Sequence, residues 1–167
     1  MSDPGRLRLE GEHRGVRFER RYDASPPEVW AALTEPGRLA RWFAQAELEL
    51  RVGAPYTLRF DPDDDTQQAR GEVLALEPGR ILELSWQHPE QPDSVVRFEL
   101  EPDGDGTLLV LDQRAVPARS APGLAAGWHA HLDSLDAHLG EGAETDWWSR
   151  FQELASVYEA QKAGVTR

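Results

Sequence analysis

The segment that most constrains the fold is 121–139, the longest run in which apolar residues recur at helical spacing. Six apolar side chains fall within about 60° of one line along such a helix, a stripe wide enough to pack against a sheet. They are Leu124, Ala125, Trp128, Leu132, Leu135 and Leu139. The helix would be roughly 28 Å long, enough to cross the concave face of a curved sheet. We therefore expect one long helix that packs against a curved sheet formed by the preceding residues.

Most of the sequence before this helix alternates between apolar and polar residues, as half-buried strands do. Such stretches lie at residues 16–22, 47–51, 56–60, 71–77, 81–86, 95–101 and 107–113. Short turns separate several of them, and the clearest is the hairpin turn at 103–106. Consecutive strands joined by short turns pair antiparallel, so the sequence predicts a curved antiparallel sheet of about six to seven strands. The fold class is α+β.

Three further helices are predicted. Two short ones follow the first strand: Ser25 and Glu28 have the spacing of a capping box, and Pro36 begins the second helix. An additional amphipathic helix covers the C-terminal part, with its apolar stripe in 145–162. The predicted organisation is a flexible arm at 1–15, one domain at 16–140 and an additional amphipathic helix within 141–167.

Composition narrows the classes of partner. The 167 residues carry a formal net charge of -12, which disfavours nucleic acid and anionic membrane surfaces. There is no cysteine, so disulfides and thiolate metal or catalytic sites are excluded. No apolar run approaches the roughly 18 residues of a membrane helix. We expect a cytoplasmic protein with no membrane partner.

The pair His129 and His131 has the pattern His-x-His, which can indicate a metal site. On a helix, residues two apart point about 200° away from each other, so these two cannot share an ion. The sequence therefore predicts no metal site and no cofactor. We expect His129 to be exposed beside Asp133, and His131 to lie at the rim of a cavity.

An aromatic set is the strongest candidate for a binding site. Its members lie on the faces of strands and helices that are predicted to point inward: Trp30, Trp42, Phe43, Tyr56, Phe60, Trp86, Phe98 and Trp128. They could simply fill a core, because aromatic side chains dominate cores in general. They could equally line a pocket, since pockets are mostly apolar with a few polar groups. Leu132 belongs to the same predicted face, and Arg97, His131 and Tyr56 are the expected polar anchors.

Three stretches together resemble a known family. They are ASPPEVWAALTEPGRLARWF at 24–43, VVRFELEPDGDGTLLVLDQ at 95–113 and GWHAHLDSLDAHL at 127–139. They resemble homologues of the activator of the heat-shock-protein-90 ATPase (AHSA-like proteins), within the START-like or SRPBCC superfamily. The resemblance implies a helix-grip fold, in which the long helix lies over a curved sheet and the short helices close one end. It does not imply a single chemistry, because fold and function separate widely in such superfamilies.

The leading hypothesis is a non-catalytic module that binds a small hydrophobic or amphipathic molecule under the long helix. A cyclase-like or hydrolase-like enzyme that uses His131 as general acid or base is one alternative. Another is a co-chaperone or stress-related interaction protein. The C-terminal aromatic residues either pack on the chain itself or join two chains as a homodimer, and they are Trp147, Trp148, Phe151 and Tyr158.

Overall fold

Eight strands and four α-helices make up the part of the chain that the structure describes. This computed structural model describes residues 4–9, 14–61, 63–140 and 146–165. In chain order the elements are β1 (Arg6–Arg8), β2 (Gly15–Tyr22), α1 (Pro26–Thr34), α2 (Pro36–Trp42), β3 (Gln45–Leu48), β4 (Pro55–Arg59), β5 (Gln68–Glu77), β6 (Ile81–His88), β7 (Gln91–Asp103), β8 (Gly106–Arg114), a short 3₁₀ turn (Ala118–Ser120), α3 (Ala121–His138) and α4 (Trp147–Val165).

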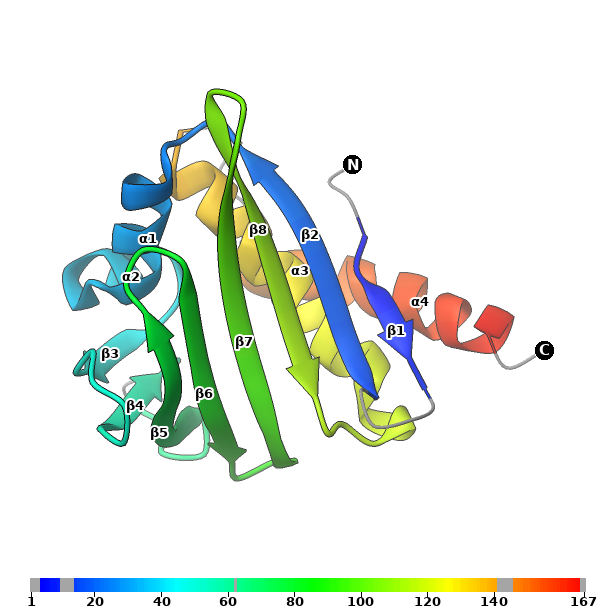
Figure 1. Ribbon diagram of the computed structural model, residues 1–167. Helices are drawn as coiled ribbons and strands as arrows, with labels where there is room; N and C mark the ends of the chain where they lie inside the picture. The colour runs from blue at the N-terminus through cyan, green and yellow to red at the C-terminus, as the bar shows by residue number, and fades with distance from the viewer. Residues whose placement is uncertain (1–3, 10–13, 62, 141–145, 166–167) are drawn as a thin grey trace.

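The strands form one antiparallel sheet in the order β1-β2-β8-β7-β6-β5-β4-β3. Figure 1 shows the sheet curving around α3, which runs along its concave side. From β3 to β8 every strand pairs with its neighbour in sequence, as short turns require, and β2 closes onto β8. The predicted α+β helix-grip fold is confirmed.

The N-terminal segment is more ordered than the sequence predicts. Residues 6–8, within the arm expected to be flexible, form β1 and pair antiparallel with β2. The strand is only three residues long, too short to show an alternation in sequence. It is held in place by Gln161 of α4, more than 150 residues away in the chain. The amide of Leu7 donates to Oε1 of Gln161 at 2.8 Å, and Nε2 of Gln161 donates to the carbonyl of Gly5 at 3.1 Å.

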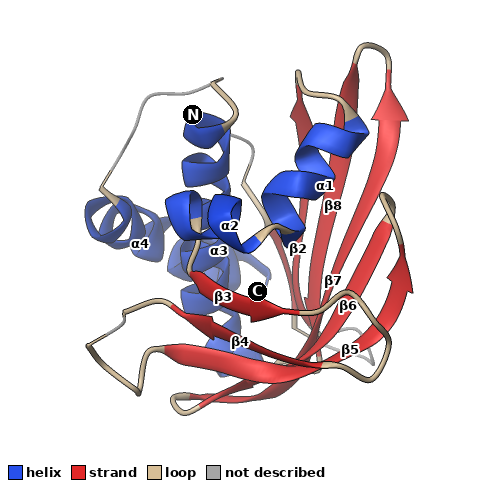
Figure 2. Cartoon of the chain, turned by 90° about the vertical axis from the view of Figure 1, so that its left-hand side faces the viewer, coloured by secondary structure: helices blue, strands red, loops and turns tan. Residues whose placement is uncertain are grey.

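The two short helices form where their capping signals predict. Ser25 Oγ accepts from the amide of Glu28 at 3.4 Å, and a proline stands in the first turn of each helix. Trp42 ties the pair together, since its Nε1 donates to the carbonyl of Ala32 at 2.8 Å. Figure 2 shows α1 and α2 together at one end of the curved sheet.

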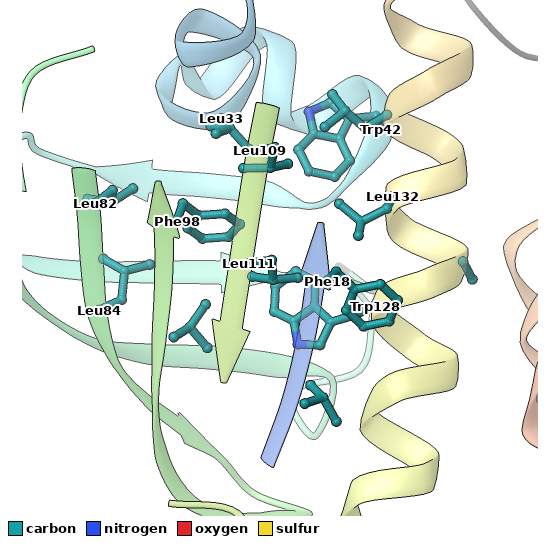
Figure 3. Close-up of a cluster of buried hydrophobic side chains, with 14 of the residues drawn as sticks. Phe18, Leu33, Trp42, Leu82, Leu84, Phe98, Leu109, Leu111, Trp128 and Leu132 are labelled. Carbon is teal, nitrogen blue, oxygen red and sulfur yellow. The ribbon is translucent and has the colours of Figure 1, made fainter. Parts of the chain in front are cut away.

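Helix α3 buries the face that its periodicity predicts. Ala125, Trp128, Leu132 and Leu135 are all buried, and Trp128 is only 4% exposed. Figure 3 shows Trp128 and Leu132 projecting from α3 toward the sheet, with Trp42 beside them. The core therefore lies between α3 and the concave face.

Helix α4 packs on its own chain, beside α3 and on the side away from β7 and β8 (Figure 2). Leu154 and Tyr158 are buried, at 1% and 0% exposure. Tyr158 therefore packs on its own chain, which is one of the two predicted alternatives, and the homodimer stays a prediction. Trp148 remains 57% exposed. Among the described residues, no helix has the length and apolar character needed to cross a membrane.

Candidate functional site

A small apolar cavity lies between the two short helices and the concave face of the sheet. Its volume is about 20 Å³, which is room for roughly one water molecule. The side chains that line it are Leu33, Leu39, Trp42, Phe43, Leu48, Tyr56, Leu58, Leu82, Leu84, Trp86 and Phe98. Five of them belong to the predicted aromatic set. The leucines were not predicted as site residues, although most lie at alternating, inward-facing positions of predicted strands.

The polar atoms of the lining aromatic residues are turned toward protein partners. Tyr56 donates its hydroxyl hydrogen to the carbonyl of Ser85 at 2.6 Å, and burial raises the pKa of Tyr56. The indole nitrogen of Trp86 donates to Gln91 at 3.3 Å. With the indole of Trp42 bonded to the backbone of α1, the cavity wall presents carbon. Tyr56, which the sequence suggested as a polar anchor, packs as an apolar ring.

A stack of aromatic rings separates this cavity from α3. The ring of Phe43 stacks on Trp42, with centroids 5.0 Å apart, and on Trp128, at 5.5 Å. Trp86 contacts Trp128 at 5.7 Å, and Phe60 meets Phe43 edge to face at 5.2 Å. The structure therefore brings these predicted residues into one cluster, with Phe43 at its centre.

Trp128 is fixed by a buried chain of hydrogen bonds that the sequence analysis did not predict. Its Nε1 donates to Oε1 of Gln113 at 2.7 Å, and Nε2 of Gln113 donates to Ser94 Oγ at 2.7 Å. Gln113 and Ser94 are both buried. Gln113 is polar at an inward position of a strand, which is the one sequence signal that could have identified it.

His131 lies against the same aromatic cluster on α3. Its ring meets Phe43 edge to face at 4.7 Å and lies 5.7 Å from Phe60 and 5.1 Å from Trp147. Burial lowers the pKa of His131 to about 3, so the imidazole is neutral at physiological pH. Its Nδ1 is fully buried and has no hydrogen-bond partner.

Arg97 does not belong to this site. It lies on the outer face of the sheet, where its guanidinium contacts Glu83 at 2.8 Å and Glu99 at 2.7 Å. A one-residue step along a strand reverses the face, so Phe98 points inward and Arg97 outward. Arg97, Glu99, Asp112 and Arg17 share an open outer depression of about 560 Å³ with other side chains. The prediction that Arg97 anchors a ligand beside Trp128 is wrong.

The prediction that His129 is exposed is also wrong. The side chain is 0% exposed, and its Nδ1 lies 2.7 Å from the hydroxyl of Tyr158. Burial, together with the positive charge of Arg20, lowers the pKa of His129 to about 4. Its solvent-facing position in the helical pattern is covered by α4, whose packing site the sequence does not specify.

Two residues of the predicted site, Trp30 and Leu132, do not line the cavity. Trp30 is partly buried against the core but does not line the cavity, and Leu132 is fully buried on α3 without lining it. Among the described residues, no group of three or more histidine or acidic side chains is placed to hold a metal ion.

The family comparison gives a match over most of the chain. Residues 23–140 match the family described as Activator of Hsp90 ATPase homolog 1-like protein. A search of curated proteins gave no significant match.

Several solved structures are similar, two of them over nearly the whole chain. CalU16 from Micromonospora echinospora is 32% identical with a TM-score of 0.76, over 96% of this chain and 95% of that one. A Bordetella parapertussis protein, encoded by gene BPP1335, is 32% identical with a TM-score of 0.74, over 95% and 90% of the two chains. DynU16, a protein of the dynemicin biosynthetic locus, is 28% identical with a TM-score of 0.67, over 74% of this chain and 46% of that one.

Proposed function

Because the chain belongs to the family of Activator of Hsp90 ATPase homolog 1-like proteins, with a fold that commonly binds hydrophobic ligands, we propose that it binds a small hydrophobic or amphipathic molecule between α2, the sheet and α3. The observation that carries this proposal is the cavity beneath α2, because its lining is almost entirely apolar.

The size of the cavity defines how binding must occur. A volume of about 20 Å³ is far below the roughly 300 Å³ of an ordinary ligand pocket. A ligand therefore has to displace lining side chains. Phe43 is the best candidate to move, since it is only partly buried and stands at the end of α2, where the chain leaves the helix.

The chemistry of the wall defines the ligand class. The hydrogen-bonding atoms of Trp42, Tyr56 and Trp86 are already used by protein groups. Charged ligands would leave water without compensation in such a site.

Catalysis receives less support. Among the described residues, no carboxylate forms a hydrogen bond or ion pair with His131, and burial alone accounts for the low pKa of that imidazole. General acid–base chemistry near neutral pH favours a group with a pKa close to 7. We therefore propose binding and not turnover.

The proposal is tested with N-phenyl-1-naphthylamine, an uncharged dye whose emission rises in apolar surroundings. Saturable 1:1 binding to the full chain is expected. Leu58→Trp fills the cavity and should weaken binding at least tenfold, whereas the exposed Leu50→Trp is the matched control and should bind as the parent does.

A cavity-enlarging variant guards against loss of folding in Leu58→Trp. Leu84→Ala should bind the dye more tightly, because it adds space to the lining. Circular dichroism checks that each variant is folded. Equal dye affinity in all folded variants would contradict the proposal, as would the absence of saturable binding.

A further inference from the structure

Two buried polar atoms without hydrogen-bond partners lie on neighbouring helices beside the aromatic cluster. One is Nδ1 of His131 on α3, and the other is Nε1 of Trp147 at the start of α4. The two rings are in contact, with centroids 5.1 Å apart and an angle of 36° between their planes. The pair comes from residues 16 apart in the sequence, brought together only because α4 folds back along α3.

Such atoms are unusual because they are costly. A buried donor or acceptor that loses water and gains no partner destabilises a protein, and most native polar groups avoid this. The uncompensated atoms of Arg8 and Asp112 belong to side chains that already form an ion pair with each other. His131 and Trp147 have no such explanation, since neither side chain forms a hydrogen bond with another of the described residues.

We propose that His131 and Trp147 together bind one neutral oxygen atom, a hydroxyl or a carbonyl, of the molecule that enters the cavity beneath α2. This inference rests on the proposed binding function and adds the polar feature of the ligand. The indole nitrogen can only donate, so the ligand must supply an acceptor to Trp147. The imidazole is neutral and offers Nδ1 either as donor, to a carbonyl, or as acceptor, from a hydroxyl.

The position of Phe43 connects this pair with the apolar cavity. Phe43 lines the cavity, and its ring meets the ring of His131 edge to face at 4.7 Å. One aromatic ring therefore separates the two sites. A displacement of Phe43, which ligand entry requires in any case, joins them into one space with an apolar end and a polar end.

The aromatic residues of α4 form a stack that runs from Trp147 outward to solvent, and only Trp147 belongs to the proposed site. Trp147 stacks on Phe151 at 5.1 Å, and Phe151 stacks on Trp148 at 5.6 Å. Trp148 is 57% exposed. The indole of Trp147 lies close to Gly127, since a Cβ placed there would be in ordinary contact with its Cζ2 atom, at 3.9 Å. The ring thus lies directly on α3, one turn before His131.

The surroundings favour a neutral group over an anion. The imidazole is enclosed by Phe43, Phe60, Trp128 and Trp147, and no cation forms an ion pair with it among the described residues. A carboxylate would lose its hydration for two neutral donors. The chain also carries a net charge of -12.

The experiment compares three probes of similar shape in displacement of N-phenyl-1-naphthylamine from the full chain. 2-Acetylnaphthalene carries a carbonyl, 2-naphthol carries a hydroxyl, and 2-isopropylnaphthalene carries neither. After correction for their partitioning from water into hexane, the two oxygen-bearing probes should bind the parent protein about tenfold tighter than 2-isopropylnaphthalene. Trp147→Phe and His131→Phe should each reduce this preference at least threefold, whereas Trp148→Phe should leave it unchanged.

Two measurements separate loss of the site from loss of folding. Trp147→Phe keeps an aromatic ring in the stack and removes an N–H that has no partner, so its thermal midpoint should stay within a few degrees of the parent. The indole ¹⁵N–¹H resonance of Trp147 should shift on addition of 2-acetylnaphthalene and much less with 2-isopropylnaphthalene.

The outcomes distinguish the two proposals. If all three probes displace the dye but the preference survives both substitutions, the polar site is wrong while apolar binding stands. If neither the dye nor any probe binds saturably, the binding function fails and the polar site fails with it.

Discussion

The hydroxyl of Tyr158 on α4 lies 2.7 Å from Nδ1 of His129 on α3, and the same oxygen accepts from the amide of Gly5 at 2.7 Å. A hydroxyl can accept two hydrogen bonds and donate one, so the tautomer of His129 sets the direction of its bond to Tyr158; when the hydroxyl donates, the imidazole carries its proton on Nε2. That nitrogen faces Asp133, with Nε2 and Oδ2 3.8 Å apart. One phenol thus joins the N-terminal segment, α3 and α4.

Replacement of this hydroxyl tests the connection. Tyr158→Phe leaves Gly5 and His129 without their buried partner, so the free energy of unfolding should fall by about 1 to 3 kcal/mol. Urea denaturation measures the change. Val157→Ala, at a 38% exposed neighbour, is the control and should cost about 0.5 kcal/mol or less. Equal effects in the two variants would contradict the role given to Tyr158.

Two histidines of α3, the buried His129 and the partly buried His131, predict acid sensitivity in a defined window. Burial lowers the pKa of His129 to about 4 and that of His131 to about 3, from an ordinary value of 6.5. Because the unfolded chain binds these protons at a higher pH than the folded chain, the stability that the neutral histidines contribute is fully present above pH 6.5. It is lost as the pH falls toward 4. Each histidine contributes a slope of up to about 1.4 kcal/mol per pH unit.

Denaturation at pH 7.5, 6.5, 5.5 and 5.0 checks this slope. Carboxyl groups titrate mainly below this range, so the histidines dominate between pH 6.5 and 5. The imidazole resonances of His129 and His131 should remain those of the neutral form at pH 5.5. A free energy of unfolding that does not change between pH 7.5 and 5.0 would contradict the lowered pKa values of these two histidines.

An ion pair between Arg150 of α4 and Asp133 of α3 is a second contact that holds α4 in place. Asp133 accepts from Arg150 of α4 at 2.8 Å and from Arg20 of β2 at 3.2 Å, and the Arg20 side chain is only 5% exposed. Asp133→Asn should destabilise the protein by about 2 to 4 kcal/mol, because it removes a carboxylate that lies 3.2 Å from a buried guanidinium. Glu153→Gln removes the exposed ion pair of the same Arg150 and should lower the free energy of unfolding by less than about 1 kcal/mol.

Two glycines should respond in opposite directions to the same substitution. At Gly127 of α3 a Cβ meets only Trp147 at 3.9 Å, an ordinary contact, so Gly127→Ala should stabilise the protein by about 0.5 to 1 kcal/mol. At Gly71 of β5 a Cβ would lie 2.3 Å from the carbonyl oxygen of Ser85, so Gly71→Ala should destabilise it. Thermal denaturation compares both variants with the parent.

The outer face of the sheet provides a test of which side binds ligand. Glu83 lies between Arg97 and Arg114, at 2.8 and 2.7 Å. Although burial opposes its ionisation, the hydrogen bonds from both arginines hold the pKa of Glu83 below its usual value. Arg97→Gln should cost about 1 kcal/mol of stability and leave the affinity for N-phenyl-1-naphthylamine unchanged. A tenfold loss of dye affinity would place Arg97 back in the binding site.

Much of the architecture is readable in the sequence because it depends on local periodicity. The stripe that contains Trp128 predicts α3, alternation predicts β4 to β8, and Ser25 predicts the start of α1. These signals depend on neighbours one to four residues away. β1 escapes detection because three residues cannot show a period. Besides its pairing with β2, the segment is held by Gln161, which bonds Leu7, and by Tyr158, which bonds Gly5, at the other end of the chain.

Some residues of the predicted site are placed correctly and others are not, because local periodicity predicts the direction of a side chain but not its distant partners. Trp42, Phe43, Tyr56, Trp86 and Phe98 meet at the cavity because each lies on an inward face. Whether their polar atoms are free to bind a ligand does not follow from the direction of the side chains. It depends on hydrogen-bond partners, such as the carbonyls of Ser85 and Ala32, that only the tertiary structure brings close.

The sequence by itself determined which residues point toward the core and which toward solvent within each element, because side-chain direction follows from helical and strand geometry. Only the tertiary structure decided how much space the core leaves, that α4 covers His129, and that Trp147 lies against His131 with both nitrogens unpartnered. These properties depend on how elements distant in sequence pack against each other, and packing distances are not encoded in any local pattern.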